Sequence, residues 1–344
     1  MAQAAAAGNT SASRAQAALT FLRSQMTPSG LLDSYVEDGI DRSYTYDDAL
    51  AAMAFIVAGD VHSARSILDA FQAIGPTKHG GFLEAYHAAT GKPDGILVAG
   101  PNAYLLQAIN LYYATTRDPR YDVLAKTLAD YLLSLQDGDG GLFGRSGVTW
   151  KSTENNLGAY CAIRNMGILH GNPDYLEKAE KIHQFLVNKC WDGRRFLRGK
   201  NDPTVVTDVQ ALGALVLGLD FAQGVFWVKG ATYVITRSPE GRSITGFDFD
   251  GDRDTIWTEG TLQQALAFLT TAADPQKGLY YKAEMEKLVR PSGALLLTPH
   301  SGTAGSGWTL QPWQAVAPTA WYLFLSFKTN PLQLLVHGQF MRKV

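Results

Sequence analysis

The sequence is short of cysteine and of excess positive charge, and it has no long apolar run; each shortage narrows the possible functions. Its 344 residues include only two cysteines, Cys161 and Cys190, which we interpret as buried free thiols, with a single disulfide as the alternative. The formal net charge of -2 is not that of a basic nucleic-acid-binding surface. No apolar run reaches the ~18 residues of a membrane span. We therefore predict neither a nucleic-acid partner nor a membrane span.

Signs of targeting are also scarce. Residues 1–13 are rich in alanine and serine, and we predict that they are disordered. They lack the basic start and long apolar core of a secretion signal. The localisation stays open: secreted or periplasmic if a signal has been removed, and cytoplasmic otherwise. We place a single catalytic domain at 14–328 and a C-terminal tail at 329–344.

Apolar residues are abundant, at 46% of the chain against 18% charged, which indicates a globular protein with a large core. Within it, a unit of helix, short turn, helix and long loop repeats. Helices that follow the long loops begin near residues 46, 102, 154, 207, 258 and 313, at intervals of roughly 52 to 56 residues. Helices that follow the short turns are expected at 61–74, 120–136, 174–189, 220–234 and 275–289, and the helix at 15–25 makes a sixth.

This repeat predicts an all-α fold, an (α/α)6 toroid of six inner and six outer helices, with short β-hairpins in the long loops. Segments 49–58, 157–169 and 211–219 carry almost no charge, as inner helices should, whereas 174–181 is highly charged. Short turns should lie on one face of the ring and long loops on the other. A loose helical solenoid or two helical bundles are the alternatives.

Four acids stand at the predicted starts of inner helices: Asp47, Glu154, Asp208 and Glu259. The positive end of a helix dipole stabilises a carboxylate, so each acid taken alone is explained by capping. Capping does not require the tryptophans found in the same loops. Their joint placement predicts an acidic, aromatic-lined pocket, in which rings stack on sugars and acids bind hydroxyl groups.

Glycoside cleavage requires a protonated carboxyl group that donates to the leaving oxygen and an ionised one that activates water or attacks carbon. We predict Glu154 as the acid, with Trp150 as an apolar wall that raises its pKa. Asp208 is the predicted base, and Asp47 or Glu259 could replace it or bind substrate. Carboxyl groups on non-adjacent helix starts leave room for a water molecule, which favours inversion.

Residues that neighbour these acids, or that lie in the same loops, are the predicted substrate contacts. They are Tyr44, Tyr46, Asp48, Trp150, Asn155, Asn156, Gln210, Asp254, Trp257, Trp308 and Trp313.

The segments 44–50, 152–156, 208–211 and 257–261, within the six-unit layout, resemble the six-hairpin (α/α)6-barrel glycosidase superfamily over about residues 15–328. The resemblance implies hydrolysis of glycosidic bonds by acidic pairs at inner-helix starts, frequently with inversion. Endoglucanases are among its members, so it favours an endoglucanase-like enzyme with a β-glucan as substrate. It implies a carbohydrate partner and no cofactor, and leaves the oligomeric state open.

Other functions on this scaffold need other residues. A sugar epimerase would need paired histidines, and His79, His87 and His300 lie in long loops rather than at inner-helix starts. A polysaccharide lyase, a terpene cyclase and a non-catalytic glycan-binding protein remain alternatives, whereas a zinc-dependent lanthionine-type cyclase would need more Cys and His ligands.

The acidic loop 248–254 is a separate feature. Its aspartates alternate, and Glu259 follows at the twelfth position, as in a calcium-binding loop. However, Arg253 occupies the sixth position, where such loops have glycine. We therefore predict no metal, and interpret the segment as a hydroxyl-binding loop or a solvated turn.

Overall fold

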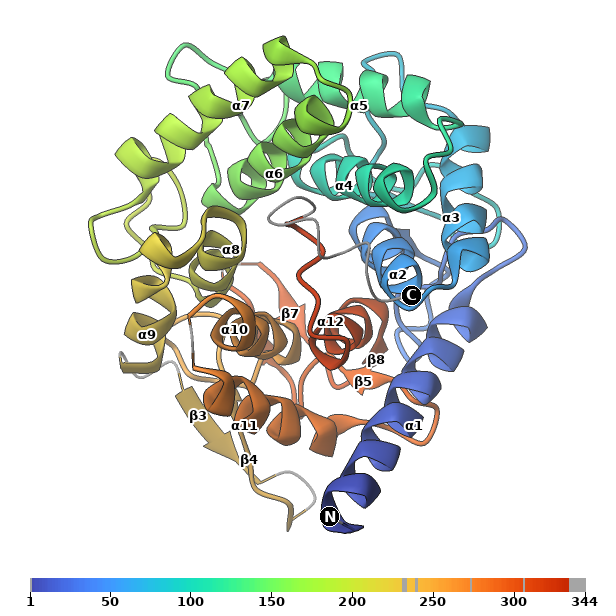
Figure 1. The fold of residues 1–344 in the computed structure, drawn as a ribbon, viewed down its shortest axis with the longest axis vertical. Coiled ribbons are helices and arrows are strands. Elements are labelled where there is room, and N and C mark those ends of the chain that lie inside the picture. The colour runs from blue at the N-terminus through green and yellow to red at the C-terminus, as the bar shows by residue number, and fades with distance from the viewer. Residues whose placement is uncertain (1, 231–233, 239–240, 273, 306, 334–344) are drawn as a thin grey trace.

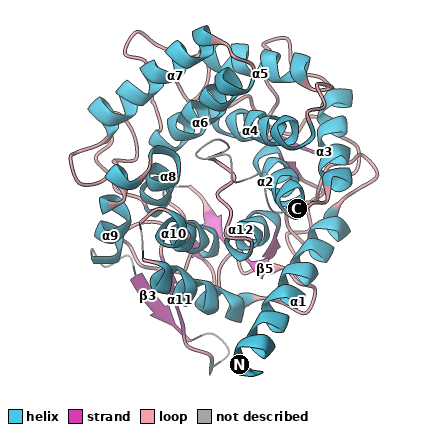
Figure 2. Ribbon diagram, in the orientation of Figure 1, coloured by secondary structure: helices cyan, strands magenta, loops and turns pink. Residues whose placement is uncertain are grey.

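The computed structural model describes residues 2–230, 234–238, 241–272, 274–305 and 307–333. In this part of the chain, twelve α-helices dominate and the strands are short (Figure 2). The predicted all-α toroid is confirmed. None of the described helices combines the length and the apolar character that crossing a membrane would require.

The inner helices form a closed ring around the centre of the molecule (Figure 1). Each packs against the next, and the last returns to the first. Their starts agree with the sequence prediction to within three residues. They are α2 (Thr45–Val57), α4 (Ala99–Thr116), α6 (Thr153–Leu169), α8 (Thr207–Leu217), α10 (Thr258–Thr270) and α12 (Val316–Ser326).

The outer helices surround this ring. Five of them pack on the inner helix that precedes them in the chain, while α1 packs on α12 and so joins the two ends of the repeat. Outer helices present one apolar face to the ring and charged residues to solvent, as their position requires. They are α1 (Ala2–Gln25), α3 (Val61–Ile74), α5 (Asp122–Ser134), α7 (Pro173–Phe185), α9 (Gln223–Gly230) and α11 (Pro275–Met285).

Two helices differ from the sequence prediction in more than small shifts of their ends. The first begins at Ala2, so it includes residues 2–13, for which the sequence analysis predicts disorder. The ninth ends at Gly230, and Val234–Arg237 is strand β3, so the predicted helix over 220–234 is too long. The β-branched run at 234–236 pairs with a second strand instead. The domain boundaries stay a prediction, and residues 334–344 of the predicted tail lie outside the described part.

The long loops contain the short β-structure that the sequence predicts. Each described sheet is an antiparallel pair of strands, and no larger sheet forms among the described residues. The pairs are β1 (Ser43–Tyr44) with β2 (Ala85–Tyr86), β3 (Val234–Arg237) with β4 (Ile244–Phe247), β5 (Leu295–Leu296) with β8 (Gln314–Ala315), and β6 (Gly302–Thr303) with β7 (Thr309–Leu310).

A hydrogen bond that recurs in all six repeats holds each long loop to the helix that follows it. A polar side chain in the first turn of each inner helix accepts the backbone N–H of a buried leucine or phenylalanine in the loop. We call these polar residues the anchors. The pairs are Asp48 with Leu32, Asn102 with Phe82, Asn156 with Leu142, Gln210 with Phe196, Thr261 with Phe247, and Thr319 with Leu295.

Several of these loops begin with a tight turn made by a glycine of positive φ. At Gly140 φ is +91°, and an added Cβ would collide with the backbone carbonyl of Lys181 on the next outer helix. Only glycine satisfies both conditions without strain. The turn therefore brings the loop close against the outer helices before it reaches its anchor.

Residues just after α12 fill the centre of the ring near the C-terminal halves of the inner helices. Gln107 of α4 donates to the Pro331 carbonyl (2.7 Å), and Asn165 of α6 donates to that of Leu332 (3.2 Å). Asn330 donates to the carbonyl of Leu215 on α8 (2.8 Å). The start of the predicted tail is thus part of the core.

Candidate active site

The anchors define equivalent positions in the six repeats. The position two residues before each anchor lies in the first turn of its inner helix, at the long-loop end of the ring. In order, these six residues are Tyr46, Gly100, Glu154, Asp208, Glu259 and Ala317. Three successive inner helices, α6, α8 and α10, therefore each present an acid at the same level. The other three positions carry a tyrosine and two small residues.

Glu154 lies close enough to the other two acids that their charges act on it. Burial, followed by the charges of Asp208 and Glu259, raises the pKa of Glu154 to about 8. The side chain is half-buried. Its carboxyl group takes part in no hydrogen bond among the described residues, so its proton is available to a ligand. A neutral carboxylic acid at physiological pH is what general-acid catalysis needs.

Asp208 has a different environment at the start of α8. Burial raises its pKa to about 6, but its carboxylate accepts the N–H of Val209 (2.8 Å), and this hydrogen bond and the charge of Arg198 oppose the shift. Backbone N–H groups at a helix start favour the ionised form of an acid. Of the two, Asp208 therefore loses its proton first.

Glu259 is held by its neighbours. The Tyr46 hydroxyl donates to Glu259 Oε1 (2.6 Å), and Gln263, one turn further along α10, donates to the same oxygen (3.2 Å). Trp321 of α12 donates in turn to the Tyr46 hydroxyl (3.4 Å). Burial, opposed by the Tyr46 bond and supported by the charges of Asp47 and Asp208, raises the pKa of Glu259 to about 8.

Asp47 completes the acidic group from the opposite side of the ring. It is buried, the Ser34 hydroxyl donates to it, and burial raises its pKa to about 7. Its Oδ2 atom has no hydrogen-bond partner among the described residues, and neither has Gln263 Oε1. An unpaired buried acceptor is costly, so each of these two atoms needs a donor that the described residues do not supply.

Aromatic side chains lie beside these acids in two groups, one formed by Tyr46 and Tyr104 and the other, which we call the aromatic wall, by Tyr35, Tyr44 and Trp313. The rings of Tyr46 and Tyr104 meet edge-on at 4.7 Å, and the charge of Glu154 acts on the hydroxyl groups of both. Tyr35 lies between Tyr44 and Trp313, with ring centroids 6.0 and 5.6 Å away.

The sequence analysis missed four of the residues around these acids: Tyr35, Tyr104, Gln263 and Trp321. Three of them, Tyr104, Gln263 and Trp321, stand two residues after an anchor, so aligning the repeats on the anchors would have found them. Tyr35 stands in a loop and has no such signal.

The predicted tryptophans are placed unevenly. Trp150 lies against Gly144 of its own loop and is 49% exposed. The charge of Glu154 acts on Tyr46 and Tyr104, and the role of Trp150 as an apolar wall stays a prediction. Trp308 is 61% exposed, whereas Trp257 is buried against Phe249. Of the predicted tryptophans, Trp313 contacts Tyr35 directly, and Trp257 belongs to a small buried cluster against which Tyr35 packs.

The predicted polar contacts fall into two groups. Asp48, Asn156 and Gln210 are fully buried anchors whose bonds go to loop residues, so we assign them a structural role. Asn155 instead lies beside Gly100, where an added Cβ would meet its Oδ1 at 2.5 Å, so Asn155 reaches the level of the acids. Asp254 belongs to the separate acidic loop.

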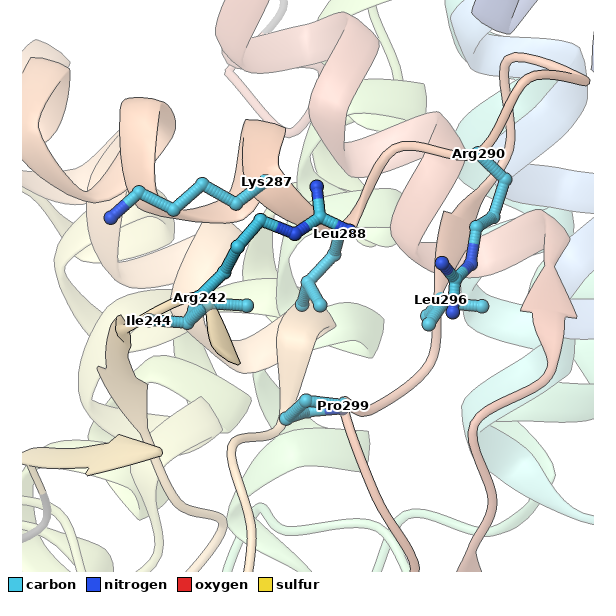
Figure 3. Close-up of a pocket in the computed structure, with 7 residues that line it drawn as sticks. All are labelled: Arg242, Ile244, Lys287, Leu288, Arg290, Leu296 and Pro299. Atoms are coloured by element: carbon cyan, nitrogen blue, oxygen red, sulfur yellow. The ribbon is translucent and has the colours of Figure 1, made fainter. Parts of the chain in front are cut away.

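A small basic pocket lies between β4, the end of α11 and β5, away from these acids (Figure 3). None of the candidate acids lines it, so it is separate from the acidic group. Its lining residues are Arg242, Ile244, Lys287, Leu288, Arg290, Leu296 and Pro299.

The remaining candidate ligands lie elsewhere. His79 and His87 are exposed, and His300 Nε2 lies 3.1 Å from the backbone oxygen of Asp254. Cys161 and Cys190 are buried and free. In the described part of the chain, neither paired histidines nor a Cys–His zinc cluster joins the acids.

No family model matches the sequence, and no curated protein matches it either. Solved structures do match the fold. A glycosidase variant in complex with glucose has a TM-score of 0.72 at 14% identity, over 94% of this chain and 97% of that one. A glycoside hydrolase family 76 mannosidase from Bacteroides thetaiotaomicron has a TM-score of 0.64 at 14% identity, over 92% and 98%.

A third structure, described as a novel alpha-amylase from Clostridium perfringens, has a TM-score of 0.66 at 10% identity, over 92% of this chain and 97% of that one. At these identities the likeness shows the fold alone. The chain therefore has the (α/α)6 fold that these glycosidases share, with no single family assigned, as the sequence resemblance implied.

Proposed function

We propose that the chain is a glycoside hydrolase that acts on an oligosaccharide or polysaccharide. The observation that carries the proposal is the acidic group formed by Glu154, Asp208 and Glu259 at one level of the inner ring. Mutual repulsion and burial make such a group of acids unfavourable for the stability of the folded protein. The glycosidase fold, the two unpaired acceptors and the aromatic wall support the same function.

In the proposed mechanism, neutral Glu154 donates its proton to the glycosidic oxygen as the bond to the anomeric carbon breaks. Ionised Asp208 removes a proton from the water molecule that attacks this carbon. Tyr46 and Gln263 orient Glu259, and Asp47 and Glu259 bind sugar hydroxyls. After one turnover Glu154 is ionised and Asp208 protonated, and a proton exchanged with solvent restores both.

The proposal has two more specific parts: hydrolysis inverts the configuration at the anomeric carbon, and the substrate is a β-glucan. Inversion requires carboxyl groups separated by about 6.5–9.5 Å, so that water fits between them. Glu154 and Asp208 stand on neighbouring inner helices, whereas Glu154 and Glu259 are separated by one helix, so Glu259 is the alternative base. The likeness to a glucose-bound glycosidase supports a glucan, and the mannosidase makes mannans the second substrate to test.

A sugar epimerase or lyase on the same fold, and a glycan-binding protein without activity, are the competing functions. The positions of the histidines argue against an epimerase. Catalysis is supported by the pairing of Glu154, whose pKa is raised to about 8, with Asp208, whose pKa is raised only to about 6, in one acidic group.

The test is the release of reducing ends from purified β-glucans, α-glucans and mannans by the wild-type protein. We expect hydrolysis of at least one of these, with a β-glucan first. Proton NMR of the first products then shows whether the new anomer is inverted. Binding of a glycan without any release would identify a binding protein, and a product with a new carbon–carbon double bond, detected by its ultraviolet absorbance, would identify a lyase.

A further inference from the structure

Three aspartates converge in the loop between β4 and α10. One carboxylate oxygen from each of Asp248, Asp252 and Asp254 lies within 4.8 Å of the other two. Three negative charges this close repel one another strongly unless a cation or protons balance them. The arrangement therefore needs an explanation beyond that of a solvated turn.

Two of these carboxylates present unpaired oxygens. Asp248 is completely buried, and its Oδ2 atom has no hydrogen-bond partner in the described part of the chain. The Oδ1 atom of Asp254 is likewise buried and unpaired there. A buried carboxylate oxygen without a donor is costly, and a bound cation is one of the few partners that would satisfy it.

Nearby donors orient the carboxylates without neutralising them. The Thr303 hydroxyl lies within 3.0 Å of Asp252 Oδ2 and 2.9 Å of Asp254 Oδ2. Arg237 donates to the backbone oxygens of Arg253 and Asp254 rather than to their side chains. Among the described ion pairs, none includes an aspartate of this loop.

In the sequence analysis, Arg253 is the residue that argues against a calcium-binding loop, because such loops have glycine at this position. In the structure, however, Arg253 adopts the backbone conformation that such a loop needs. Its φ is +59°, in the left-handed region that the expected glycine would occupy. By contrast, Glu259 does not close the loop as a twelfth ligand, because it binds Tyr46 at the acidic group instead. The ligands must therefore come from the aspartates and their neighbours alone.

We propose that Asp248, Asp252 and Asp254 bind a divalent cation, with calcium as the preferred ion. All the candidate ligands are oxygens, which suit hard cations, and three separate carboxylates with water fit the flexible coordination of calcium better than the strict octahedron of magnesium. This site replaces the hydroxyl-binding loop or solvated turn that the sequence predicts.

The loop is attached to the starts of two catalytic helices. The Phe249 carbonyl accepts the N–H of Thr207, the residue before Asp208 (2.8 Å), and the Phe247 carbonyl accepts the N–H of Trp257, two residues before Glu259 (2.9 Å). A bound cation would thus stiffen the support of both acids. This consequence rests on the proposed function, whereas binding of the cation does not.

The test is isothermal titration of calcium chloride into the chelator-treated full-length protein, with the melting temperature measured in parallel. We expect one calcium ion per chain, a higher melting temperature with calcium, and weaker binding of magnesium. Asp252→Asn and Asp254→Asn should each lower calcium affinity at least ~10-fold. Asp250→Asn, in the same loop but outside the triplet, should change it by less than about 3-fold.

Absence of both a binding heat and a shift in melting temperature at millimolar calcium would overturn the proposal. Equal losses of affinity in Asp250→Asn and Asp252→Asn would also overturn it, because they would show a diffuse acidic patch rather than a site. These measurements need no substrate, so their failure would leave the proposed hydrolase function standing, and an inactive protein that binds calcium would refute only that function.

Discussion

At the scale of single residues, three acids in equivalent positions differ in their hydrogen bonds, and the pKa of Asp208 is raised only to about 6, whereas those of Glu154 and Glu259 are raised to about 8. Glu154 has no donor among the described residues, Asp208 accepts a helix N–H, and Glu259 accepts from Tyr46 and Gln263. A carboxyl group without donors is the hardest to ionise when buried. This difference is the basis for assigning Glu154 as the acid and Asp208 as the base.

The pH dependence of catalysis follows from these environments. The value of kcat/KM should rise as Asp208 ionises, with a pKa of about 6, and fall as Glu154 loses its proton, with a pKa of about 8. The measurement is kcat/KM between pH 4 and pH 10, in steps fine enough to resolve both limbs.

The charge of Glu259 raises the pKa of Glu154, so Glu259→Gln should move the alkaline limb to lower pH. An alkaline limb that is absent, or that does not move in this variant, would argue against Glu154 as the acid.

Single residues were predictable from the sequence where helix starts were clear. The four acids all lie near the long-loop end of the ring, as predicted. The roles of Asp48, Asn156 and Gln210 were not predictable from the sequence, since an acid or amide in a first turn looks the same whether it faces a ligand or its own loop. Only the hydrogen-bond partners distinguish the two.

At the scale of elements, each inner helix and the loop before it behave as one unit, because the anchor bonds them together. Asn156 shows this most fully: it accepts the Leu142 N–H (2.7 Å) and donates to the carbonyls of Leu142 (3.1 Å) and Ser152 (2.8 Å). Glu154 lies within the segment that these bonds hold. The anchor therefore affects both stability and the position of the acid.

Replacing the anchor tests this coupling. Asn156→Ala leaves buried backbone groups unpaired, and we expect it to lower the free energy of unfolding by roughly 2–4 kcal/mol, as measured by urea denaturation. It should also reduce kcat, because α6 loses its fixed start.

Asn188→Ala, at an exposed asparagine, is the matched control and should change both quantities little. An Asn156→Ala protein as stable as this control would show that the anchor bonds contribute nothing.

The starts of α2, α6, α8 and α10 were predictable because each begins with threonine and has an acid in its first turn. The starts of α4 and α12 lack this signal, and their predicted positions are each three residues away from the observed ones. Helix ends were less predictable. The helix predicted over 220–234 ends at Gly230 because Val234–Arg237 pairs with Ile244–Phe247 in a hairpin, and the prediction extended the helix into the β-branched start of this strand. The turn at Arg253 was missed for a related reason: a residue type expected to avoid positive φ adopts it here.

At the scale of the whole molecule, the ring concentrates its buried acids at one end, and folding must retain their protons. The pKa values of Asp47, Glu154, Asp208 and Glu259 are all raised by burial above those of the unfolded chain. Between about pH 5 and pH 8 the folded state thus holds protons that the unfolded state has released. These acids stabilise the fold at low pH, and that contribution is lost as the pH rises through their folded pKa values.

The unfolding temperature should therefore fall as the pH rises from 5 to 8.5, and Glu154→Gln should weaken this dependence because glutamine does not titrate. We expect the variant to match the wild type near pH 5 and to exceed its free energy of unfolding by on the order of 2 kcal/mol at pH 8.5. Calorimetry in matched buffers measures both. A variant with the same loss of stability at high pH as the wild type would contradict a buried, neutral Glu154.

The most direct test of the central claim, that Glu154 transfers the proton, is turnover of the best glycan by Glu154→Gln. We predict a fall in kcat of at least ~10³-fold with glycan binding retained, because glutamine keeps the shape but has no proton to give. Glu177→Gln, on the exposed face of α7, should be as active as the wild type. Turnover by Glu154→Gln within about tenfold of the wild type would remove Glu154 from the mechanism.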